Sequence, residues 1–270
     1  MSASLFGIVI PVMNQMEVTR ECIAHIRSHS CGQLPILIVD NGSRAEYMDE
    51  LRSLSDYYIR NEENIGVIPA MDQAWQVLDT PYIMYLHNDL FILEPEFDVR
   101  VNRILTEVPF VGVAGFGGAH SVNCVGVRTS FTSNLVDAES HGTRLLEDYA
   151  PSVVLDGMCL IVRKELIQRL GGLVNHFSIH HYYDMDICLE AIYRGYKVLT
   201  IGVPIHHLGS RTASQPEYAA WLGKKGLTDW DLFEMNRNRF VSKWGGRQFV
   251  VVDSQFNYCD AHGPIYMKTT

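Results

Sequence analysis

The chain has 270 residues, 47% of them hydrophobic and 20% charged, so it can bury a large core and is too apolar to be a disordered protein. Its formal net charge is -9 with no lysine- and arginine-rich run, which argues against nucleic acid as a partner. The six cysteines form no CxxC pair, the start lacks signal-peptide features, and no apolar run reaches the ~20 residues of a transmembrane segment, so we expect a reduced, cytoplasmic protein with at most peripheral membrane contact.

The chain begins with an alternation of strand and helix patterns. An apolar run at 5–12 predicts a strand, and apolar residues at helical spacing predict a helix within 14–30. Asn14, followed three residues later by Glu17, resembles a capping box at the start of this helix. Residues 35–43 then predict a short strand that stops at an Asn-Gly turn.

The alternation continues to about residue 116. It comprises a polar helical stretch to about 56, the segment 56–66, a helix at about 68–78, a strand at 82–89, a helix at about 96–107 and a strand at 110–116. Such a pattern predicts a mostly parallel sheet with helices on both faces, whose ligands bind beyond the carboxyl ends of the strands. Asn14, Asp40, Asn64 and Asp89 fall at or just after these ends, so we expect them to converge on one crevice.

The second half of the chain is less regular at first. Residues 117–151 lose the period and are rich in Gly, Ser, Thr and Asn, which indicates long loops with a β-ribbon. Order then returns as a strand and a helix at 153–173, a helix and a strand at 182–207, and a tail helix at 231–246. Gly171 and Gly195 are expected to end the first two of these helices. No linker separates the halves, so we expect a single domain.

Seven segments in this order resemble glycosyltransferase family 2. They are IVIPVMN, ILIVDNGS, NIGVIPAMDQAW, YIMYLHND, LDGMCLIVRKELIQRLGG, YYDMDICLEAIYRGYKV and IHHLGS, within roughly residues 5–210. The resemblance implies one α/β domain of the GT-A fold, a Rossmann-like nucleotide-diphospho-sugar transferase fold with a mostly parallel central sheet, over residues 1–270. It further implies a nucleotide-sugar-binding half at 1–116, an acceptor and catalytic half at 117–210, and a C-terminal helical extension at 211–270.

The resemblance implies a divalent cation at the end of the strand 82–89. In this family the strand delivers Asp-x-Asp, or a reduced form of it, and the last acid binds the cation that grips the donor diphosphate. Here the motif is His87-Asn88-Asp89, so Asp89 is the expected metal ligand and Asn88 a donor-side residue. Oxygen ligands suit Mn²⁺ or Mg²⁺. The family also places a histidine after the last strand as a second ligand, and of His206 and His207 we choose His207.

The resemblance also implies residues for the nucleotide. The family's acid at the position of Asp40 contacts the base, although Asp40 alone is equally typical of an Asx-turn in Asp-Asn-Gly-Ser. Pro11, Asn14 and Asn64 match further nucleotide-side positions, and each also suits a structural turn or cap. Arg211 follows the last motif and is expected on the diphosphate, with a solvated surface position as the alternative.

Asp184 matches the general base of the inverting members, in a motif that reads Tyr183-Asp184-Met185-Asp186 here. The alternative is that Asp184 is the N-cap of the helix that follows, a role in which aspartate is common. Asp186 is expected to support the loop or to contact the acceptor.

The function implied is an inverting, metal-dependent transfer of a sugar from a nucleoside-diphosphate sugar to a hydroxyl acceptor such as a glycan, a lipid-linked sugar or a protein. Two alternatives stay open: a non-catalytic sugar-nucleotide-binding module, and a sugar-phosphate nucleotidyltransferase, although the glycine-rich loop of the latter is missing after the first strand. His176, His180 and His181 have no zinc-like spacing with cysteines, so no metal site is expected there. Trp221 is a candidate for stacking on an acceptor sugar.

Overall fold

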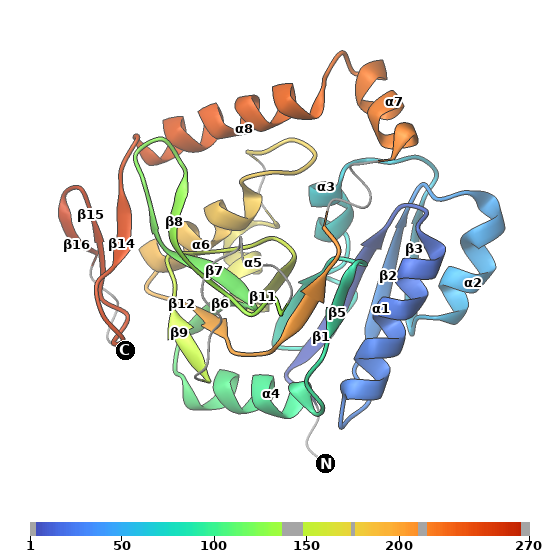
Figure 1. Cartoon of the computed structure of the whole chain (residues 1–270), viewed down its shortest axis with the longest axis horizontal. Helices are drawn as coiled ribbons and strands as arrows, with labels where there is room; N and C mark the ends of the chain where they lie inside the picture. The colour runs from blue at the N-terminus through green and yellow to red at the C-terminus, as the bar shows by residue number, and fades with distance from the viewer. Residues whose placement is uncertain (1–3, 137–147, 174–175, 210–214, 266–270) are drawn as a thin grey trace.

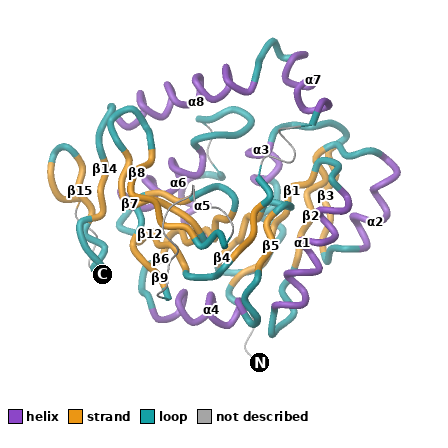
Figure 2. The backbone as a smooth tube through the Cα atoms, viewed as in Figure 1, coloured by secondary structure: helices purple, strands orange, loops and turns teal. Residues whose placement is uncertain are grey.

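The computed structural model describes residues 4–136, 148–173, 176–209 and 215–265. At its centre lies an eight-stranded sheet (Figures 1 and 2). Its strands, in spatial order, are β3 (Tyr57–Asn61), β2 (Ile36–Asn41), β1 (Phe6–Val12), β4 (Tyr82–Leu86), β11 (Cys159–Arg163), β6 (Val111–Gly115), β12 (Lys197–Ile201) and β9 (Tyr149–Pro151).

The sheet is mostly parallel, as the alternating sequence pattern predicts. Strands β1, β2, β3 and β4 pair in parallel, and β6 pairs in parallel with β12, whereas β11 and β9 run antiparallel to their neighbours. Every residue of β2, β4 and β6 is buried. Strands covered on both faces need apolar side chains on both, which explains why β4 and β6 carry no charged residue and why β2 is apolar up to Val39.

The helices connect these strands. They are α1 (Met16–His29), the 3₁₀ helix η1 (Ala45–Tyr47), α2 (Met48–Ser53), α3 (Val67–Asp72), α4 (Phe97–Glu107), α5 (Lys164–Leu170), α6 (Tyr183–Tyr193), α7 (Pro216–Lys224) and α8 (Asp229–Trp244). Figure 1 shows α4 along one edge of the molecule and α8 along the opposite edge. Helix α5 ends at Gly171 in the left-handed conformation, as predicted. Among the described residues, no helix has the length and apolar character needed to cross a membrane.

Two local predictions about the helices are wrong. The N-cap of α1 is Gln15, which makes no capping hydrogen bond with its side chain, so Asn14 and Glu17 form no capping box. The Asn14 side chain instead accepts a hydrogen bond from the backbone N–H of Arg44 at 3.0 Å, a tertiary contact that replaces local capping. Helix α3 ends at Asp72 rather than near residue 78, because the chain beyond it tightens into turns with i to i+3 hydrogen bonds.

Smaller sheets complete the fold beside the central one. The predicted β-ribbon is confirmed as a hairpin of β7 (Gly117–Val122) and β8 (Arg128–Ser133). Strand β7 also pairs with β10 (Val154–Leu155) and β14 (Phe249–Val251), which continues to β15 (Tyr258–Asp260) and β16 (Gly263–Ile265). The tail therefore contains strands as well as helices. Strand β13 (Ile205–His207) pairs with β5 (Leu90–Ile92) in a separate two-stranded sheet.

Helix α8 is fastened to the body of the protein through α6. The buried carboxylate of Asp186 accepts hydrogen bonds from Nζ of Lys243 and Nε1 of Trp244, each at 2.8 Å. Asp186 thus anchors α8 to α6, a role different from the expected support of the loop or contact with the acceptor. A capping box of Thr228 and Asp231 starts α8, and Gly245 ends it.

Candidate active site

A cavity of about 780 Å³ opens where β1, β2 and β4 end. These strands are parallel, so their carboxyl ends meet at one edge of the sheet, and Met13, Asn41 and Asn88 reach the cavity from there. Asn88 is buried and its side chain donates a hydrogen bond to Oγ1 of Thr19 on α1 at 2.9 Å. The turn after β4 is therefore held against α1, with Asn88 on the cavity wall.

Two of the predicted nucleotide-side residues, Pro11 and Asn64, line this cavity. Asn64 is fixed by Nδ2 of Asn41, which donates to its Oδ1 at 2.8 Å, and by the N–H of Gly66, which donates to the same oxygen at 2.8 Å. Gly42 adopts a left-handed backbone, and a Cβ there would lie 2.6 Å from the backbone nitrogen of Asn64. The glycine therefore allows the two asparagines to meet at the strand end.

Asp40, the predicted base-contacting residue, does not lie on the cavity. Its side chain is fully buried and is paired with Arg60, while Oη of Tyr58 donates to it at 2.6 Å and the N–H of Ser43 at 2.9 Å. Side chains alternate along a strand, so Asp40 and Asn41 point to opposite faces, and it is Asn41 that reaches the cavity. The Asp40–Ser43 hydrogen bond stabilises the turn after β2 locally, although it reaches three residues on and not the two residues of an Asx-turn.

One other predicted donor-side residue, Asn14, is not brought to the cavity wall. Asn14 is absent from the described lining and is tied instead to the loop after β2, where its N–H donates to Oγ of Ser43 at 2.8 Å. Arg211 lies outside the described residues.

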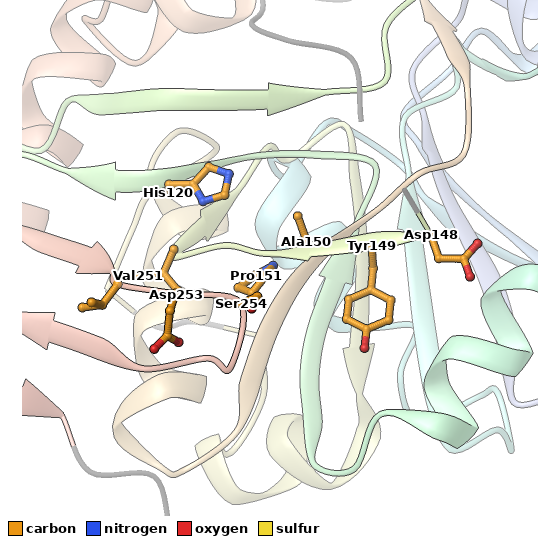
Figure 3. Close-up of a pocket in the computed structure, with 9 residues that line it drawn as sticks. His120, Asp148, Tyr149, Ala150, Pro151, Val251, Asp253 and Ser254 are labelled. Atoms are coloured by element: carbon orange, nitrogen blue, oxygen red, sulfur yellow. The ribbon is translucent and has the colours of Figure 1, made fainter. Parts of the chain in front are cut away.

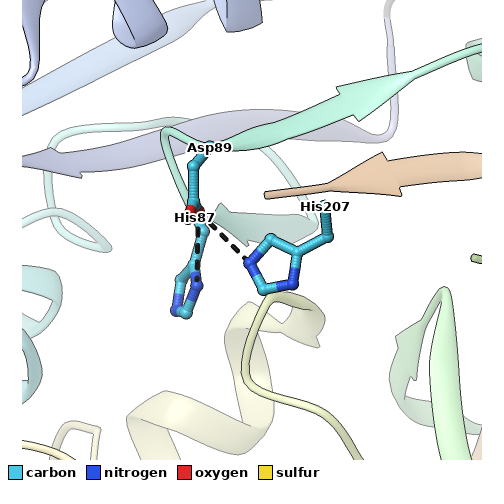
Figure 4. Close-up of side chains that lie close together, drawn as sticks. All are labelled: His87, Asp89 and His207. Carbon is cyan, nitrogen blue, oxygen red and sulfur yellow. Dashed lines mark ion pairs between the residues drawn. The ribbon is translucent and has the colours of Figure 1, made fainter. Parts of the chain in front are cut away.

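Asp89 and two histidines form a compact group on the cavity wall (Figure 4). Oδ1 of Asp89 lies 3.2 Å from Nε2 of His207 and 3.9 Å from Nδ1 of His87. His207 comes from β13 and Asp89 directly precedes β5, and the pairing of these two strands brings the two residues together. His206, the next residue along β13, instead stacks on Phe91 with ring centroids 5.7 Å apart, so strand alternation selects His207.

The donor set of this group fits a divalent transition-metal cation. Nε2 of His207 is buried and has no acceptor in hydrogen-bond geometry among the described residues. Burial lowers the pKa of His207, but the adjacent Asp89 carboxylate outweighs burial and raises it above its ordinary value. Burial lowers the pKa of His87 despite the opposing charge of Asp89. One carboxylate with one or two imidazoles suits Mn²⁺ better than Mg²⁺, which prefers oxygen ligands.

Asp184 lies on the same cavity, in the first turn of α6. The N-cap of this helix is Tyr182, so Asp184 is not the N-cap. Its Oδ2 accepts from the N–H of Gly157 at 3.0 Å and its Oδ1 from the N–H of Met185 at 2.9 Å. Burial raises the pKa of Asp184, the positive charge of Arg128 opposes that rise, and Asp156 adds to it. The result is a fixed carboxylate with increased basicity.

Arg128 and Asp156, which the sequence did not single out, lie beside Asp184 on the cavity wall. Nη1 of Arg128 donates to Oδ2 of Asp156 at 3.0 Å, and both side chains are about 30% exposed. Asp156 belongs to the segment LDGMCLIVRKELIQRLGG, which carries part of the family resemblance, so the sequence could have indicated it as a site residue. Arg128 lies in the stretch without a period, where no local pattern marked it.

The sequence also gave no signal for a second histidine group on this cavity. His180 and His181, in the loop before α6, lie beside Asp229, the first residue of α8. Burial, followed by the neighbouring His180, lowers the pKa of His181 to about 4. Trp221 is absent from the described lining and packs against Tyr218 with ring centroids 5.8 Å apart.

A separate cavity of about 720 Å³ lies beside β9 (Figure 3). His120, Tyr149 and Asp253 are among its lining residues, and none of its described lining was predicted to be part of a site. Of the predicted site residues that the structure describes, six line the first cavity and none lines this one.

Comparison with known proteins places the chain among sugar transferases. The sequence model of glycosyl transferase family 2 matches residues 7–171. A PGL/p-HBAD biosynthesis glycosyltransferase of Mycobacterium bovis (strain BCG / Pasteur 1173P2) is 26% identical over 112 residues. That match spans 40% of this chain and 44% of the relative, so less than half of the relative's length is represented.

Two solved structures resemble the fold. GalNAc-T7, solved with UDP, GalNAc and Mn²⁺, has a TM-score of 0.59 at 15% identity and covers 76% of this chain and 44% of its own. The mannosyltransferase PcManGT of Pyrobaculum calidifontis, solved with GDP-Man and Mn²⁺, has a TM-score of 0.57 at 15% identity, covering 89% of this chain and 70% of its own. These likenesses confirm the GT-A fold.

Proposed function

This chain belongs to glycosyltransferase family 2, and we propose that it transfers a sugar from a nucleoside-diphosphate sugar to a hydroxyl acceptor with inversion at the anomeric carbon. One observation carries the proposal: Asp184, the candidate base, lines the same cavity as the group of Asp89 and His207. A base and a diphosphate-binding group in one cavity are what direct displacement at a sugar carbon requires.

The strand ends are suited to hold the donor. Asn41, Asn64 and Asn88 offer amide groups at the carboxyl edge of the sheet, and Pro11 adds an apolar surface. The two structural neighbours, solved with UDP or GDP-Man together with Mn²⁺, support a donor of this class. We assign the donor to the part of the cavity built by residues 1–116 and the acceptor to the part built by later segments.

Asp89 and His207 are the residues proposed to hold a divalent cation, preferably Mn²⁺. When bound, the cation would neutralise charge on the departing diphosphate. Backbone hydrogen bonds tie the turn that carries Asp89 to two neighbouring segments. The N–H of His87 donates to the carbonyl of Met158, and the N–H of Leu208 donates to the carbonyl of Asp89. These backbone bonds keep the carboxylate and His207 in register before any ligand arrives. Arg211 stays a prediction for the diphosphate.

The chemical step is a single displacement. The acceptor oxygen forms a bond to the anomeric carbon as the bond from that carbon to the diphosphate oxygen breaks, and the electron pair of that bond leaves with the nucleoside diphosphate. The proton of the acceptor hydroxyl passes to Asp184. Attack opposite the leaving group inverts the configuration.

Asp184 is positioned for this role by the backbone around it. Two N–H groups, from Gly157 and Met185, hold its carboxylate oxygens, and the first turn of α6 favours a negative charge. Burial raises its pKa, which makes it a stronger base than an exposed aspartate. The positive charge of Arg128 beside it limits this rise in pKa, while Asp156, the ion-pair partner of Arg128, adds to it.

The test is transfer and donor hydrolysis by the Asp184→Asn variant. We expect the rate to fall by roughly 10² to 10⁴, because the amide cannot act as the base. Nucleotide affinity in the presence of Mn²⁺ should be unchanged, since the amide keeps the size of the side chain and gives up only one of its two hydrogen bonds from backbone N–H groups. Asp49→Asn, a change to an exposed carboxylate of α2, is the matched control and should behave as wild type. A full rate for Asp184→Asn contradicts the assignment. Proton NMR of the product's anomeric configuration tests inversion, and retention of configuration refutes it.

Asp89→Ala tests the donor side. This variant should lose Mn²⁺-dependent nucleotide binding, measured by thermal shift with UDP, GDP and dTDP sugars, because a ligand that binds the native state raises its stability. If the wild-type protein binds donor but neither transfers nor hydrolyses it, the chain is a binding module. If turnover instead depends on pyrophosphate, it is a nucleotidyltransferase.

A further inference from the structure

The loop before α6 and the start of α8 bring two adjacent histidines and one aspartate together on the cavity wall. Oδ1 of Asp229 lies 2.9 Å from Nε2 of His180 and 3.4 Å from Nε2 of His181. The three atoms all lie within 4.8 Å of one another. A single hydrogen-bonded His–Asp pair needs only one imidazole, whereas here both imidazoles direct Nε2 at the same carboxylate oxygen.

We propose that His180, His181 and Asp229 form a second metal site, for Zn²⁺ or a closely similar transition-metal cation. Two imidazoles and one carboxylate are a common protein set for such ions, with the remaining position left to water or a ligand. Bonds of ~2.0–2.1 Å in tetrahedral geometry place ligand atoms ~3.3 Å apart, close to the two distances to Asp229. Because these residues line the cavity, an ion can reach them without opening the fold.

Backbone conformation explains how two consecutive side chains share one target. Neighbouring residues in an extended strand point to opposite sides. Here His181 has a φ of 70° and Ile179 before the pair has a φ of 65°, both in the left-handed region. Such a conformation is strained for a residue other than glycine and persists only where the surroundings impose it. The turn therefore brings both imidazoles to one side.

The surroundings that impose this turn come from α8 and α3. Asn236 of α8 is fully buried, and its Nδ2 donates to the carbonyls of Ser178 and His180, at 2.8 Å and 2.5 Å. On the other side, the carbonyl of Ile179 accepts from the N–H of Ile68 at 3.1 Å. Asn236, which holds the turn, and Asp229 belong to the same helix α8. The histidines are thus held in place relative to Asp229 before a metal binds, as a preorganised metal site requires.

Tyr218 of α7 covers one side of the site. Its hydroxyl lies 2.9 Å from Nδ1 of His180 and 3.3 Å from Nε2 of the same ring. An oxygen this close to both ring nitrogens lies beside the ring and off the Nδ1–H axis, so Tyr218 packs against His180 without fixing its tautomer.

This site shares no ligand with the group of Asp89 and His207, so it does not depend on the proposed function. Its consequence would be local: a cation bridging the loop at 180–181 and Asp229 would tie the segment just before Asp184 to α8. We therefore expect Zn²⁺ to raise the melting temperature of the wild-type protein. In Asp229→Asn the part of this rise that comes from binding at the histidine pair should be lost.

Metal titration of the purified chain tests the proposal, with Co²⁺ absorption and calorimetry as readouts and no nucleotide present. We expect two equivalents in the wild type, loss of one in Asp229→Asn, and loss of the other in Asp89→Asn. His262→Ala, at an exposed histidine outside both groups, is the control and should keep two. Circular dichroism checks each fold, and His181→Gln repeats the test if Asp229→Asn does not fold.

The outcomes separate the two sites. Two equivalents retained in both Asp229→Asn and His181→Gln overturn the proposal, as does a single wild-type equivalent that only Asp89→Asn removes. A single equivalent lost in Asp229→Asn and kept in Asp89→Asn supports this site and counts against the Asp89 site.

Discussion

Gly157 offers a way to displace the candidate base without touching its carboxylate. The residue precedes β11 and donates its N–H to Oδ2 of Asp184. Its backbone is not in the left-handed region, so alanine is allowed there by conformation. A Cβ at this position would lie 2.7 Å from Oη of Tyr183, 3.2 Å from Cζ of the same ring and 3.4 Å from Cβ of Asp184. Gly157→Ala must therefore push Tyr183, the neighbour of the base, out of place.

The size of the effect follows from these distances. Tyr183 is buried, so its ring cannot swing into solvent, and relieving a 2.7 Å contact needs a shift of several tenths of an ångström at least. Overpacking of this kind costs ~1–3 kcal/mol of unfolding free energy, or roughly 2–10 °C in melting temperature. A misplacement of about 1 Å at a reacting group can cost ~10²-fold in rate. We expect Mn²⁺-dependent donor hydrolysis to fall by about that factor, with nucleotide affinity retained.

The matched rescue is removal of the colliding atom. Tyr183→Phe alone loses only a long 3.4 Å hydrogen bond to the carbonyl of Gly157 and should be almost as active as wild type. Gly157→Ala combined with Tyr183→Phe removes the 2.7 Å contact and should recover most of the rate. Steady-state hydrolysis and thermal unfolding of all four proteins form a double-mutant cycle. A wild-type rate in Gly157→Ala, or equal loss in the single and double variants, refutes the reasoning.

Three further predictions concern Asp40, Asp184 and Asp186. Asp40→Asn weakens the buried contact with Arg60, so it should lower the unfolding free energy by about 1–3 kcal/mol in urea denaturation. Nucleotide affinity should stay unchanged. A large loss of affinity would restore Asp40 to the nucleotide site. Asp186→Asn should cost about 1–3 kcal/mol in the same assay by loosening Lys243 and Trp244, and an unchanged midpoint would contradict that anchoring. The pKa of Asp184 is raised, and the residue must be ionised to act as a base. The rate of donor hydrolysis should therefore fall as pH drops through a value above the usual ~3.9 of aspartate. This acidic fall in the pH–rate profile should be absent in Asp184→Asn. The same raised pKa means that the folded state binds this proton more tightly than the unfolded state, so this group's contribution to stability grows as pH falls through that value.

The order of strands and helices in the first half could be predicted because each element carries its own signal. The apolar runs of β1, β2 and β4 have apolar side chains on both faces, which predicts strands buried between two layers of helices. The start of α1 could not be predicted, because a distant contact, the hydrogen bond from the N–H of Arg44 to Asn14, replaces local capping. The end of α3 could not either, because the chain after Asp72 keeps turning through i to i+3 hydrogen bonds and its apolar spacing does not mark the change. The strands of the tail could not either, since β14 exists by pairing with β7, far away in the sequence.

The site shows the same division. Asp89, His207 and Asp184 could be placed from motifs because the strand ends and the start of α6 fix them. Asp40 was predicted to contact the nucleotide. Successive side chains along β2 point to opposite faces of the sheet, and it is the side chain of Asn41 that lines the cavity. Asp229 could not be found at all, because its partners are histidines some fifty residues earlier in the chain.

The cavity joins parts of the fold that are built on different principles. The side proposed for the donor consists of strand ends whose positions are set by the hydrogen bonding of the parallel sheet. Its other wall comes from the hairpin of β7 and β8, the loop before α6, and α8, which are held by side chains such as Asn236 and Asp186. Asp184 stands where these parts meet, bonded to Gly157 beside β11 and carried by α6. Changes in α8 should therefore reach the base through α6 and its preceding loop, while the strand ends that face the donor stay in place.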